Sequence, residues 1–288
     1  MLEYRAQYPL ATMCRVLEVN RSGYYRWLKM PLSARDLRDE EIKAAILPLF
    51  ETSRRLYGSP RMHKELRKIG IHCSKKRVAR LMREMGLIAR PRRRSISTTD
   101  SAHNLPRVPN RLERKYAVGD LERLNQAWAG DMTYIRTNEG WLYLAVVIDL
   151  KSRNVVGWSM DDTMETTLVQ DALRMATRGR LPRKGALAPL LFHSDQGSQY
   201  AAKAFRDQLE QGNITGSMSR RGNCWDNAPV EAFFATLKKE VVYKENYLSK
   251  EQAKASLFDY IEVYYNRLRS HSALGYLSPA DYELSLRI

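Results

Sequence analysis

The chain has 288 residues and a formal net charge of +16. This length allows two domains with separate cores, and no apolar run approaches the roughly 18 residues of a membrane-spanning helix. The three cysteines are far apart and form no Cys-x-x-Cys pair, and no signal-peptide pattern opens the sequence, so we expect a reduced, cytoplasmic protein without a structural zinc site.

The excess positive charge is confined to the first two fifths of the chain. Residues 1–115 hold 27 Lys and Arg against 11 Asp and Glu, whereas residues 116–288 hold 21 of each. Basic charge gathered in one region is typical of a segment that covers the phosphates of a nucleic acid. The alternative is a solvated basic surface that keeps the protein soluble.

Short helices with turn signals occupy the basic region. Residues 1–29 contain two helical stretches separated by the turn cluster of residues 20–23, a weak helix-turn-helix pattern. A stronger pattern covers residues 59–86, where Ser59 and Pro60 start a helix, Gly70 ends it and Ser74 caps a second helix.

The second of these helices is amphipathic. Its apolar residues recur with helical spacing and predict one buried stripe: Val78, Leu81, Met82 and Met85. Arg77, Arg80 and Arg83 lie on other faces and are expected to project outward. A capped helix, a turn and a basic amphipathic helix are what a reader of the DNA major groove needs, so we predict DNA contacts for Arg77 and Arg80. The alternative is an ordinary helical hairpin with exposed arginines.

The boundary between the two halves is rich in Arg, Ser, Thr and Pro. We assign residues 1–89 to a helical DNA-binding region of helix-turn-helix type and residues 90–120 to a flexible basic linker. Within the linker, Arg92, Arg93 and Arg94 are expected to follow DNA phosphates in a groove.

The second half has the pattern of an α/β domain. Strands are predicted at 127–135, 142–150, 155–159, 190–193 and near 214, and helices at 165–177, 203–211 and around Glu231. Strands first, then alternating helices and strands, predict a mixed five-stranded sheet. We assign residues 121–243 to this core and residues 244–288 to a helical extension.

Three acidic residues stand out in the predicted core. Asp131 and Asp195 lie on or next to predicted strands, and Glu231 lies on the helix that follows. Carboxylate oxygens select Mg²⁺ or Mn²⁺. Two carboxylates about 4 Å apart repel by roughly 4 kcal/mol at an effective dielectric constant of 20, so three together favour a bound cation or protonation. We therefore predict a metal site with two ions, which would activate an attacking hydroxyl and stabilise a leaving oxygen.

Several residues near these acids have alternative interpretations. Lys238 follows Glu231 by almost two helical turns and points the same way, so it is either a phosphate contact or an exposed lysine. We interpret Asp149 as a turn or ion-pair residue and Asp226 as the cap of the Glu231 helix. His193 is interpreted as a packed residue at a strand end, with a proton shuttle as the alternative.

The polar loop before the Glu231 helix carries two adjacent arginines. Arg220 and Arg221, together with Asn223, are candidates for DNA contacts, and solvated side chains are the alternative.

The sequence from about residue 36 to residue 284 resembles a known family. It is similar to the second-reading-frame (OrfB) product of bacterial insertion-sequence transposases of the IS-three group, which belong to the DDE superfamily. The resemblance rests on six ordered blocks: Tyr57 to Arg61, Trp128 to Tyr134, Val147 to Arg153, His193 to Tyr200, Asn227 to Glu231, and Tyr265 through His271 to Pro279.

The resemblance implies a retroviral-integrase, ribonuclease-H-like core with Asp131, Asp195 and Glu231 as catalytic triad and Lys238 as the basic residue after the glutamate. It implies a DNA transposase that cleaves the ends of its insertion sequence and transfers the 3′-hydroxyl ends to other DNA, through a circular intermediate. The expected partners are the terminal inverted repeats and target DNA. We also expect a homo-oligomer on DNA, associated with the nucleoid, and no membrane.

In this family a leading helix-turn-helix and a leucine zipper are encoded in the preceding frame. We expect this chain to lack them and to act with, or fused to, a first-frame product. Two other functions remain open at this point: a DNA-binding regulator with an inert core, and a structure-specific or RNA-directed nuclease. The first is disfavoured because all three acids and Lys238 are present, and the second because of the basic N-terminal region.

Overall fold

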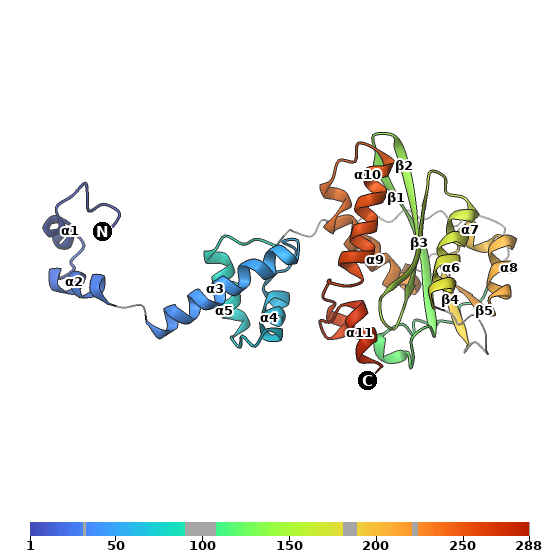
Figure 1. The fold of residues 1–288 in the computed structure, drawn as a ribbon, viewed down its shortest axis with the longest axis horizontal. Coiled ribbons are helices and arrows are strands. Elements are labelled where there is room, and N and C mark those ends of the chain that lie inside the picture. The colour runs from blue at the N-terminus through green and yellow to red at the C-terminus, as the bar shows by residue number, and fades with distance from the viewer. Residues whose placement is uncertain (31–32, 90–107, 181–188, 221–223, 288) are drawn as a thin grey trace. The chain divides into compact units, whose positions relative to one another are not determined.

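The computed structural model describes residues 1–30, 33–89, 108–180, 189–220 and 224–287 (Figure 1). The chain divides into two compact units. Unit 1 consists of Met1–Thr52 and Gly58–Ile88, and unit 2 consists of Ser53–Tyr57 and Ala89–Ile288.

The regular secondary structure of unit 1 is helical in the residues described. Its helices are α1 (Leu10–Val16), α2 (Arg21–Lys29), α3 (Ala34–Thr52), α4 (Ser59–Lys68) and α5 (Lys75–Glu84). The predicted pair α4 and α5 is present: Gly70 ends α4 with a φ of +81°, and the Ser74 side chain accepts a hydrogen bond from the backbone N–H of Arg77. The predicted stripe of α5 is buried at Val78, Leu81 and Met82.

Three details of unit 1 differ from the sequence prediction. Asn20 caps α2 by accepting a hydrogen bond from the N–H of Ser22, so part of the expected turn is helical. Gly58, not Ser59, is the N-cap of α4. The long helix α3 was not predicted, although Ile42, Ile46 and Phe50 recur every four residues along its buried side and complete the core against α4 and α5.

Unit 2 is built on one mixed sheet, as predicted. Its strands are β1 (Ala127–Thr137), β2 (Gly140–Asp149), β3 (Val155–Asp161), β4 (Leu190–Ser194) and β5 (Ile214–Met218), in the spatial order β3-β2-β1-β4-β5. The pairs β1–β2 and β2–β3 are antiparallel, whereas β1–β4 and β4–β5 are parallel. The first three strands are a meander with a tight turn at residues 138–139, and the parallel strands follow helical crossovers.

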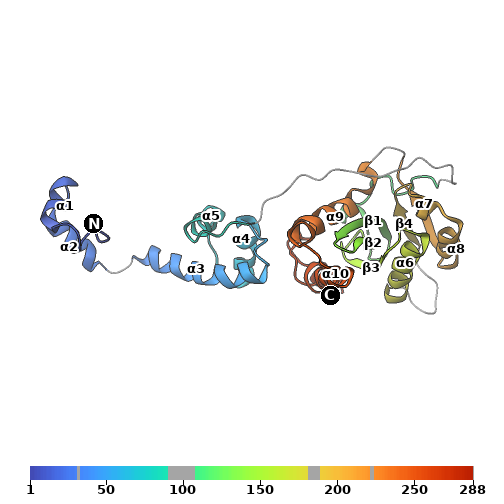
Figure 2. The same cartoon turned by 90° about the horizontal axis from the view of Figure 1, so that it is seen from above.

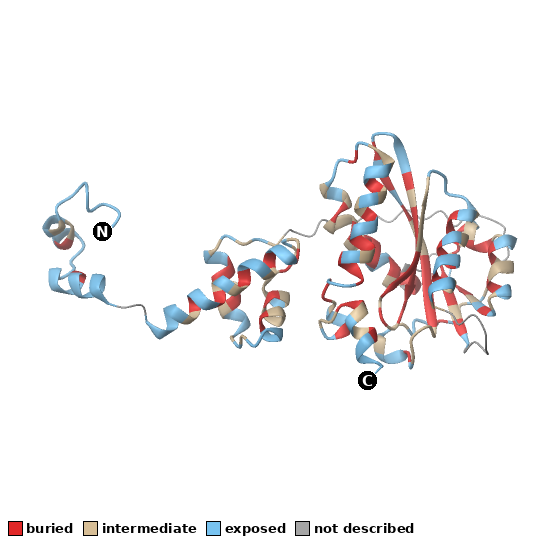
Figure 3. Cartoon of the chain, viewed as in Figure 1, coloured by how far each residue is buried: buried red, intermediate tan, exposed pale blue. Residues whose placement is uncertain are grey.

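Helices cover both faces of this sheet (Figure 2). One face packs against α6 (Thr166–Arg180), α7 (Ser198–Ala201) and α8 (Lys203–Gln211), and the other against α9 (Ala228–Glu240), α10 (Lys250–Phe258) and the π-helical segment Asp259–Tyr265. The chain ends with α11 (Pro279–Ser285), and single 3₁₀ turns occur at Val118–Asp120, Cys224–Asn227, Val242–Lys244 and Ser272–Leu274. Buried residues concentrate in the strands and on the helix faces turned to them (Figure 3).

Part of the expected linker belongs to the core of unit 2. Leu112 is buried, and the backbone N–H groups of Arg111 and Leu112 donate to the Ser217 hydroxyl. Leu112 thus packs in the core of unit 2, although it lies within the span 90–120 assigned to the linker. Arg92, Arg93 and Arg94 lie outside the described residues. Within the described ranges, no helix has both the length and the apolar character needed to cross a membrane.

Candidate active site

The pairing of β1 with β4 brings two of the predicted acids side by side. Gly130 on β1 is in register with Ser194 on β4, and the next residues along these parallel strands are Asp131 and Asp195. Neighbouring strands lie about 4.8 Å apart, so the two carboxylates start from adjacent backbone positions. Side chains alternate along a strand, and this directs Asp131 to the face that includes Ala127 and Ala129, which α9 covers.

A glycine immediately before Asp131 is a steric requirement of this arrangement. A Cβ atom at Gly130 would stand 2.5 Å from Cζ of Phe192. The Phe192 ring cannot retreat easily, because it packs against the rings of Tyr200 and Phe205 with centroid separations of 6.1 and 5.4 Å. The Gly-Asp pair of the sequence block therefore keeps β1 and β4 close where the acids emerge.

Glu231 reaches the same region from α9. The helix starts after Asn227, has Pro229 in its first turn, and is anchored to the sheet by the buried apolar residues predicted from the sequence, Val230, Phe233, Phe234 and Leu237. The Asn227 side-chain amide lies 3.5 Å from the carbonyl oxygen of Gly130 and links the helix start to β1. Glu231 sits in the first turn of α9, where the partial positive charge of the helix N-terminus favours a carboxylate.

The electrostatics show that the three acids share one environment. Burial, followed by the negative charges of Asp195 and Glu231, raises the pKa of Asp131 well above its usual value, and Lys238 opposes this shift. Burial and Asp195 also raise the pKa of Glu231. Hydrogen bonds hold the aspartates: Asp131 accepts one from the N–H of Met132 at 2.7 Å, and Asp195 accepts one from the N–H of Gly197 at 2.9 Å.

The donor set fits a hard divalent cation in its chemistry. All three side chains offer carboxylate oxygens, and a cation would relieve the repulsion that raises the pKa of Asp131. Among the described residues, however, no three acidic, histidine or cysteine side chains are close enough together to enclose a metal ion. Coordination by all three acids therefore requires their carboxylates to move together.

Lys238 lies beside the acids and is half-buried. Its Nζ atom is 5.1 Å from the centroid of the Tyr134 ring, a cation–π contact between α9 and β1. Burial lowers the pKa of Lys238, while Tyr134 and Asp131 raise it. Tyr134 was not predicted as a site residue, although it follows Asp131 by three residues in the same block.

A cavity of about 610 Å³ opens at this end of the sheet. Asp131 and Asp195 line it together with Tyr134, Trp141 and the 197–199 turn. The rings of Tyr134 and Trp141 meet edge to face with centroids 5.0 Å apart, and Trp141 is 45% exposed. The site thus combines acids, an aromatic wall and open access.

Asp149 and His193 have the packing roles predicted for them. The Asp149 carboxylate accepts hydrogen bonds from the N–H groups of Asn125, Lys151 and Ser152 and fixes the turn after β2. The buried His193 ring bonds the hydroxyls of Ser217 and Ser219 at 2.9 and 3.1 Å, and burial lowers its pKa to about 4.

The interpretation of Asp226 as a helix cap is wrong. Its buried carboxylate pairs with Arg220 and Arg114, each at 2.9 Å, and accepts a hydrogen bond from Asn110. The bond to Arg220 is the largest cause that lowers its pKa far below the usual range. Arg220 therefore forms an ion pair that the sequence did not predict, while its side chain remains 58% exposed, and its role as a DNA contact stays a prediction. Arg221 and Asn223 lie outside the described residues.

Two arginines of α5, Arg77 and Arg80, are restrained by ion pairs instead of projecting freely as expected, whereas Arg83 is exposed as predicted. Arg77 and Arg80 both donate to Asp39 on α3, at 2.5 and 2.6 Å, and Arg80 also pairs with Glu84 at 2.6 Å. This arrangement was missed because α3 itself was not predicted.

Comparisons with known proteins match the same regions. A family model described as an HTH-like domain matches residues 36–95, and two described as Integrase core domain match residues 122–224 and 231–285. Among solved structures, the simian T-cell lymphotropic virus intasome in complex with PP2A regulatory subunit B56 gamma is 17% identical, covering 77% of this chain and 70% of that chain, with a TM-score of 0.46. The Mos1 transposase catalytic domain, with Raltegravir and Mn, is 19% identical, covering 55% and 86%, with a TM-score of 0.43.

Relatives match almost the whole chain. The transposase InsF for insertion sequence IS3A of Escherichia coli K12 is 44% identical over 285 residues, which cover 98% of this chain and 96% of the relative. A protein of insertion element IS600 from Shigella sonnei, described as an uncharacterized 31 kDa protein, is 42% identical over 94% of this chain and 97% of its own length. The chain therefore belongs to the IS3 family of insertion-sequence transposases.

Proposed function

We propose that Asp131, Asp195 and Glu231 are the catalytic carboxylates with which this transposase cleaves DNA at the ends of its insertion sequence and joins the freed 3′-hydroxyl to another phosphodiester. The observation that carries this assignment is the position of Asp131 and Asp195 directly after the paired residues Gly130 and Ser194, where both line one open cavity beside the first turn of α9 that bears Glu231. Like charges that are held together at an open cavity destabilise the fold, so their retention there is typical of a functional site.

The same three side chains would hold the metal. Two Mg²⁺ or Mn²⁺ ions, when bound, would make the attacking water or 3′-hydroxyl more nucleophilic and stabilise the charge on the leaving oxygen. The protein contributes rigidity: the paired strands fix Asp131 and Asp195, and the buried face of α9 fixes Glu231. The proposal needs no protein nucleophile, because the DNA hydroxyl or water attacks phosphorus directly.

Lys238 would orient the substrate beside these acids. Its half-buried ammonium group lies against Tyr134 and feels the charge of Asp131, so it occupies the rim of the site without being a metal ligand. A phosphate of the incoming strand offers it a negative partner. Trp141, exposed on the cavity wall, offers a surface on which an unpaired base stacks.

DNA engagement would be divided along the chain. Residues 1–89 would bind the terminal inverted repeats, and the basic stretch that contains Arg92, Arg93 and Arg94 would follow DNA phosphates toward the core at 121–243. We further propose that two or more copies assemble on the paired ends and target DNA, with a first-frame product acting in the same complex and residues 244–288 supporting the core.

A strand-joining assay tests this function. Labelled duplexes with an insertion-sequence end and a free 3′-hydroxyl are incubated with the full chain, target DNA and Mg²⁺. We expect Asp131→Asn, Asp195→Asn and Glu231→Gln each to abolish joined product while DNA binding stays nearly intact, because each removes a ligand oxygen and little volume.

Asp149→Asn is the matched control. It changes a buried carboxylate on the neighbouring strand whose hydrogen bonds come from Asn125, Lys151 and Ser152 and not from the triad, so it should retain joining activity wherever the protein stays folded. Near-normal joining by a triad variant contradicts the site assignment. DNA binding without joining by the wild-type chain would favour a DNA-binding regulator instead.

A further inference from the structure

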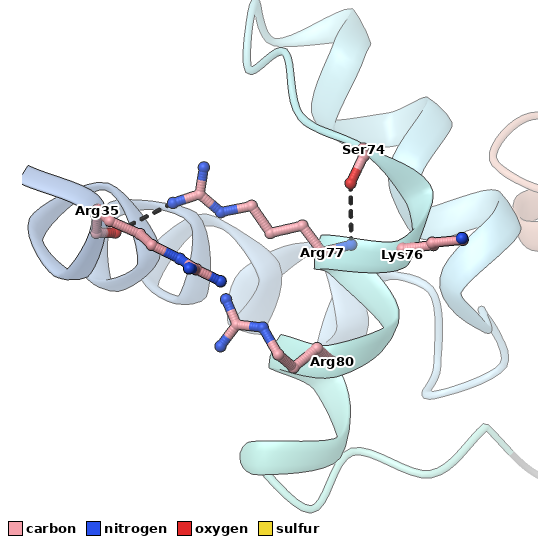
Figure 4. A pocket seen from close by; sticks show the side chains of 5 residues that line it. All are labelled: Arg35, Ser74, Lys76, Arg77 and Arg80. Carbon is pink, nitrogen blue, oxygen red and sulfur yellow. Dashed lines mark hydrogen bonds between the residues drawn. The ribbon is translucent and has the colours of Figure 1, made fainter.

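Three arginine side chains converge between α3 and α5 of unit 1. Arg35 extends from α3, and Arg77 and Arg80 extend from α5 to meet it, whereas the nearby Lys76 points away from the three (Figure 4). A cavity of about 440 Å³ lies here, and its lining consists of these four cationic residues and Ser74. Like charges repel one another, so this arrangement needs an opposite charge that holds the arginines in place.

Asp39 holds two of them. The Asp39 side chain is 9% exposed, and its two carboxylate oxygens accept separate hydrogen bonds from Nε of Arg77 and Nη2 of Arg80. These bonds, that of Arg80 first, lower the pKa of Asp39, which keeps it ionised. Because Asp39 is not among the lining residues, the cavity presents the cations and not the acid that positions them.

The pairing limits what the arginines can still bind. Arg77 uses Nε for Asp39 and Nη2 for the carbonyl oxygen of Arg35, and Arg80 uses Nη2 for Asp39 and Nη1 for Glu84. Reading a guanine requires two adjacent N–H groups that face the base edge together. Each guanidinium directs two of its five N–H groups at protein oxygens and is held in that orientation, so it is not free to turn toward a base edge, and three N–H groups remain for another acceptor.

Arg35 adds an uncommitted cation to this pair. Among the described residues, none forms a hydrogen bond or ion pair with its side chain, although its guanidinium group lies between those of Arg77 and Arg80 in Figure 4. A tetrahedral anion, whose several oxygens accept hydrogen bonds from separate directions, matches three guanidinium groups that meet at one cavity, two of them held in place by Asp39.

We propose that this cavity binds one backbone phosphate of duplex DNA, held by Arg35, Arg77 and Arg80, with Asp39 as a positioning residue. The inference rests on the proposed function for its ligand, and it replaces base reading by these arginines with sequence-independent anchoring. The fixed guanidinium groups lose little side-chain freedom on binding, so the first turn of α5 sets the register of the protein on DNA.

Binding of the full chain to duplexes, measured by fluorescence anisotropy at several salt concentrations, separates the two modes. We expect Arg35→Ala to weaken binding roughly tenfold for an element end and a scrambled duplex alike, and to reduce the slope of log affinity against log salt by about 1. Arg83→Ala, an exposed arginine of α5 outside the cavity, is the matched control and should change binding less. A loss confined to the element end would overturn the inference.

Asp39→Asn gives a result of opposite sign in the two interpretations. If Asp39 only offset positive charge, its neutralisation would strengthen DNA binding. If it positions the arginines, binding weakens although the protein becomes more basic, and Asp39→Glu restores part of it. Thermal melting checks that each variant folds, and Arg35→Ala supplies a test that leaves the Asp39 ion pairs in place.

Single methylphosphonate substitutions in the duplex identify the phosphate itself. We expect one position at which a neutral linkage weakens binding by the wild-type chain but has no further effect on Arg35→Ala. Absence of any such position contradicts the inference. Strand joining is measured in parallel, because a chain that binds through this phosphate but joins no DNA would contradict the proposed function and leave the phosphate site standing.

Discussion

Asp131→Asn should make the metal-free protein more stable while it removes activity. The substitution keeps the shape of the side chain and deletes one of two charges that emerge from adjacent strands about 4.8 Å apart. At an effective dielectric constant of 20, charges at that separation repel by about 3.5 kcal/mol. This figure takes the strand spacing as the separation of the charges, and protonation of Asp131, whose pKa is raised, relieves part of the repulsion.

We therefore expect the free energy of unfolding at neutral pH, in the presence of a chelator, to rise by about 1 to 3 kcal/mol, and the melting temperature by several degrees for a domain of this size. Urea denaturation followed by circular dichroism measures the change. Added Mg²⁺ should stabilise the wild-type chain and have much less effect on the variant, because ligands that bind only the folded state stabilise it.

The control for this prediction is Asp149→Asn. Asp149 is also buried, but backbone N–H groups of Asn125, Lys151 and Ser152 bond its two oxygens. An amide NH₂ in place of one oxygen leaves a buried donor unsatisfied, so this variant should lose about 1 to 3 kcal/mol. Equal or lower stability of Asp131→Asn relative to the wild type, without metal, would refute the electrostatic reasoning.

Three further predictions concern other parts of unit 2. Lys238→Ala should lower strand joining and binding of the DNA end, without changing the Mg²⁺ concentration that gives half-maximal residual activity. Lys238→Arg should retain part of the function. A large rise in the Mg²⁺ concentration required would instead place Lys238 in the electrostatic shell of the metal. Burial lowers the pKa of His193 to about 4 in the folded chain. Between pH 6.5 and 4 this histidine is therefore protonated in the unfolded chain but neutral in the folded chain. Stability should thus fall by about 3 kcal/mol across that window in the wild type, whereas a folded His193→Gln variant should lack this contribution in urea titrations at each pH. Gly157→Ala would place a Cβ atom 2.2 Å from the carbonyl oxygen of Ala172, so the free energy of unfolding should fall by about 2 kcal/mol or more. An unchanged melting curve would contradict the tight packing of β3 on α6.

The sequence predicts well where one local pattern decides the structure. The β-branched runs of the core became strands close to their expected bounds, and the apolar spacing of α9 placed Val230, Phe233 and Leu237 in the core. The three candidate acids could be picked out because each lies in a block whose neighbours are apolar or turn-forming. A carboxylate at such a position is not explained by a solvent-exposed surface.

Features that depend on partners distant in the chain could not be predicted. Asp226 looks like a helix cap until Arg114, more than a hundred residues earlier, is seen to pair with it. Arg77 and Arg80 look exposed on an isolated helix, and only the packing of α3 reveals that Asp39 restrains them. The helix α3 was not predicted because it contains Pro48 and because its sequence is only weakly amphipathic.

Direct attack by DNA at the acidic site is the central claim, and the stereochemistry of strand joining tests it. A target duplex with a phosphorothioate of known configuration at the joined position is incubated with the full chain, Mg²⁺ and a 3′-hydroxyl end, and the configuration at phosphorus is determined in the product. A single in-line displacement predicts inversion. Retention would mean two displacements through a protein nucleophile, such as a hydroxyl of Ser198 or Thr133 in the cavity, and would contradict the account.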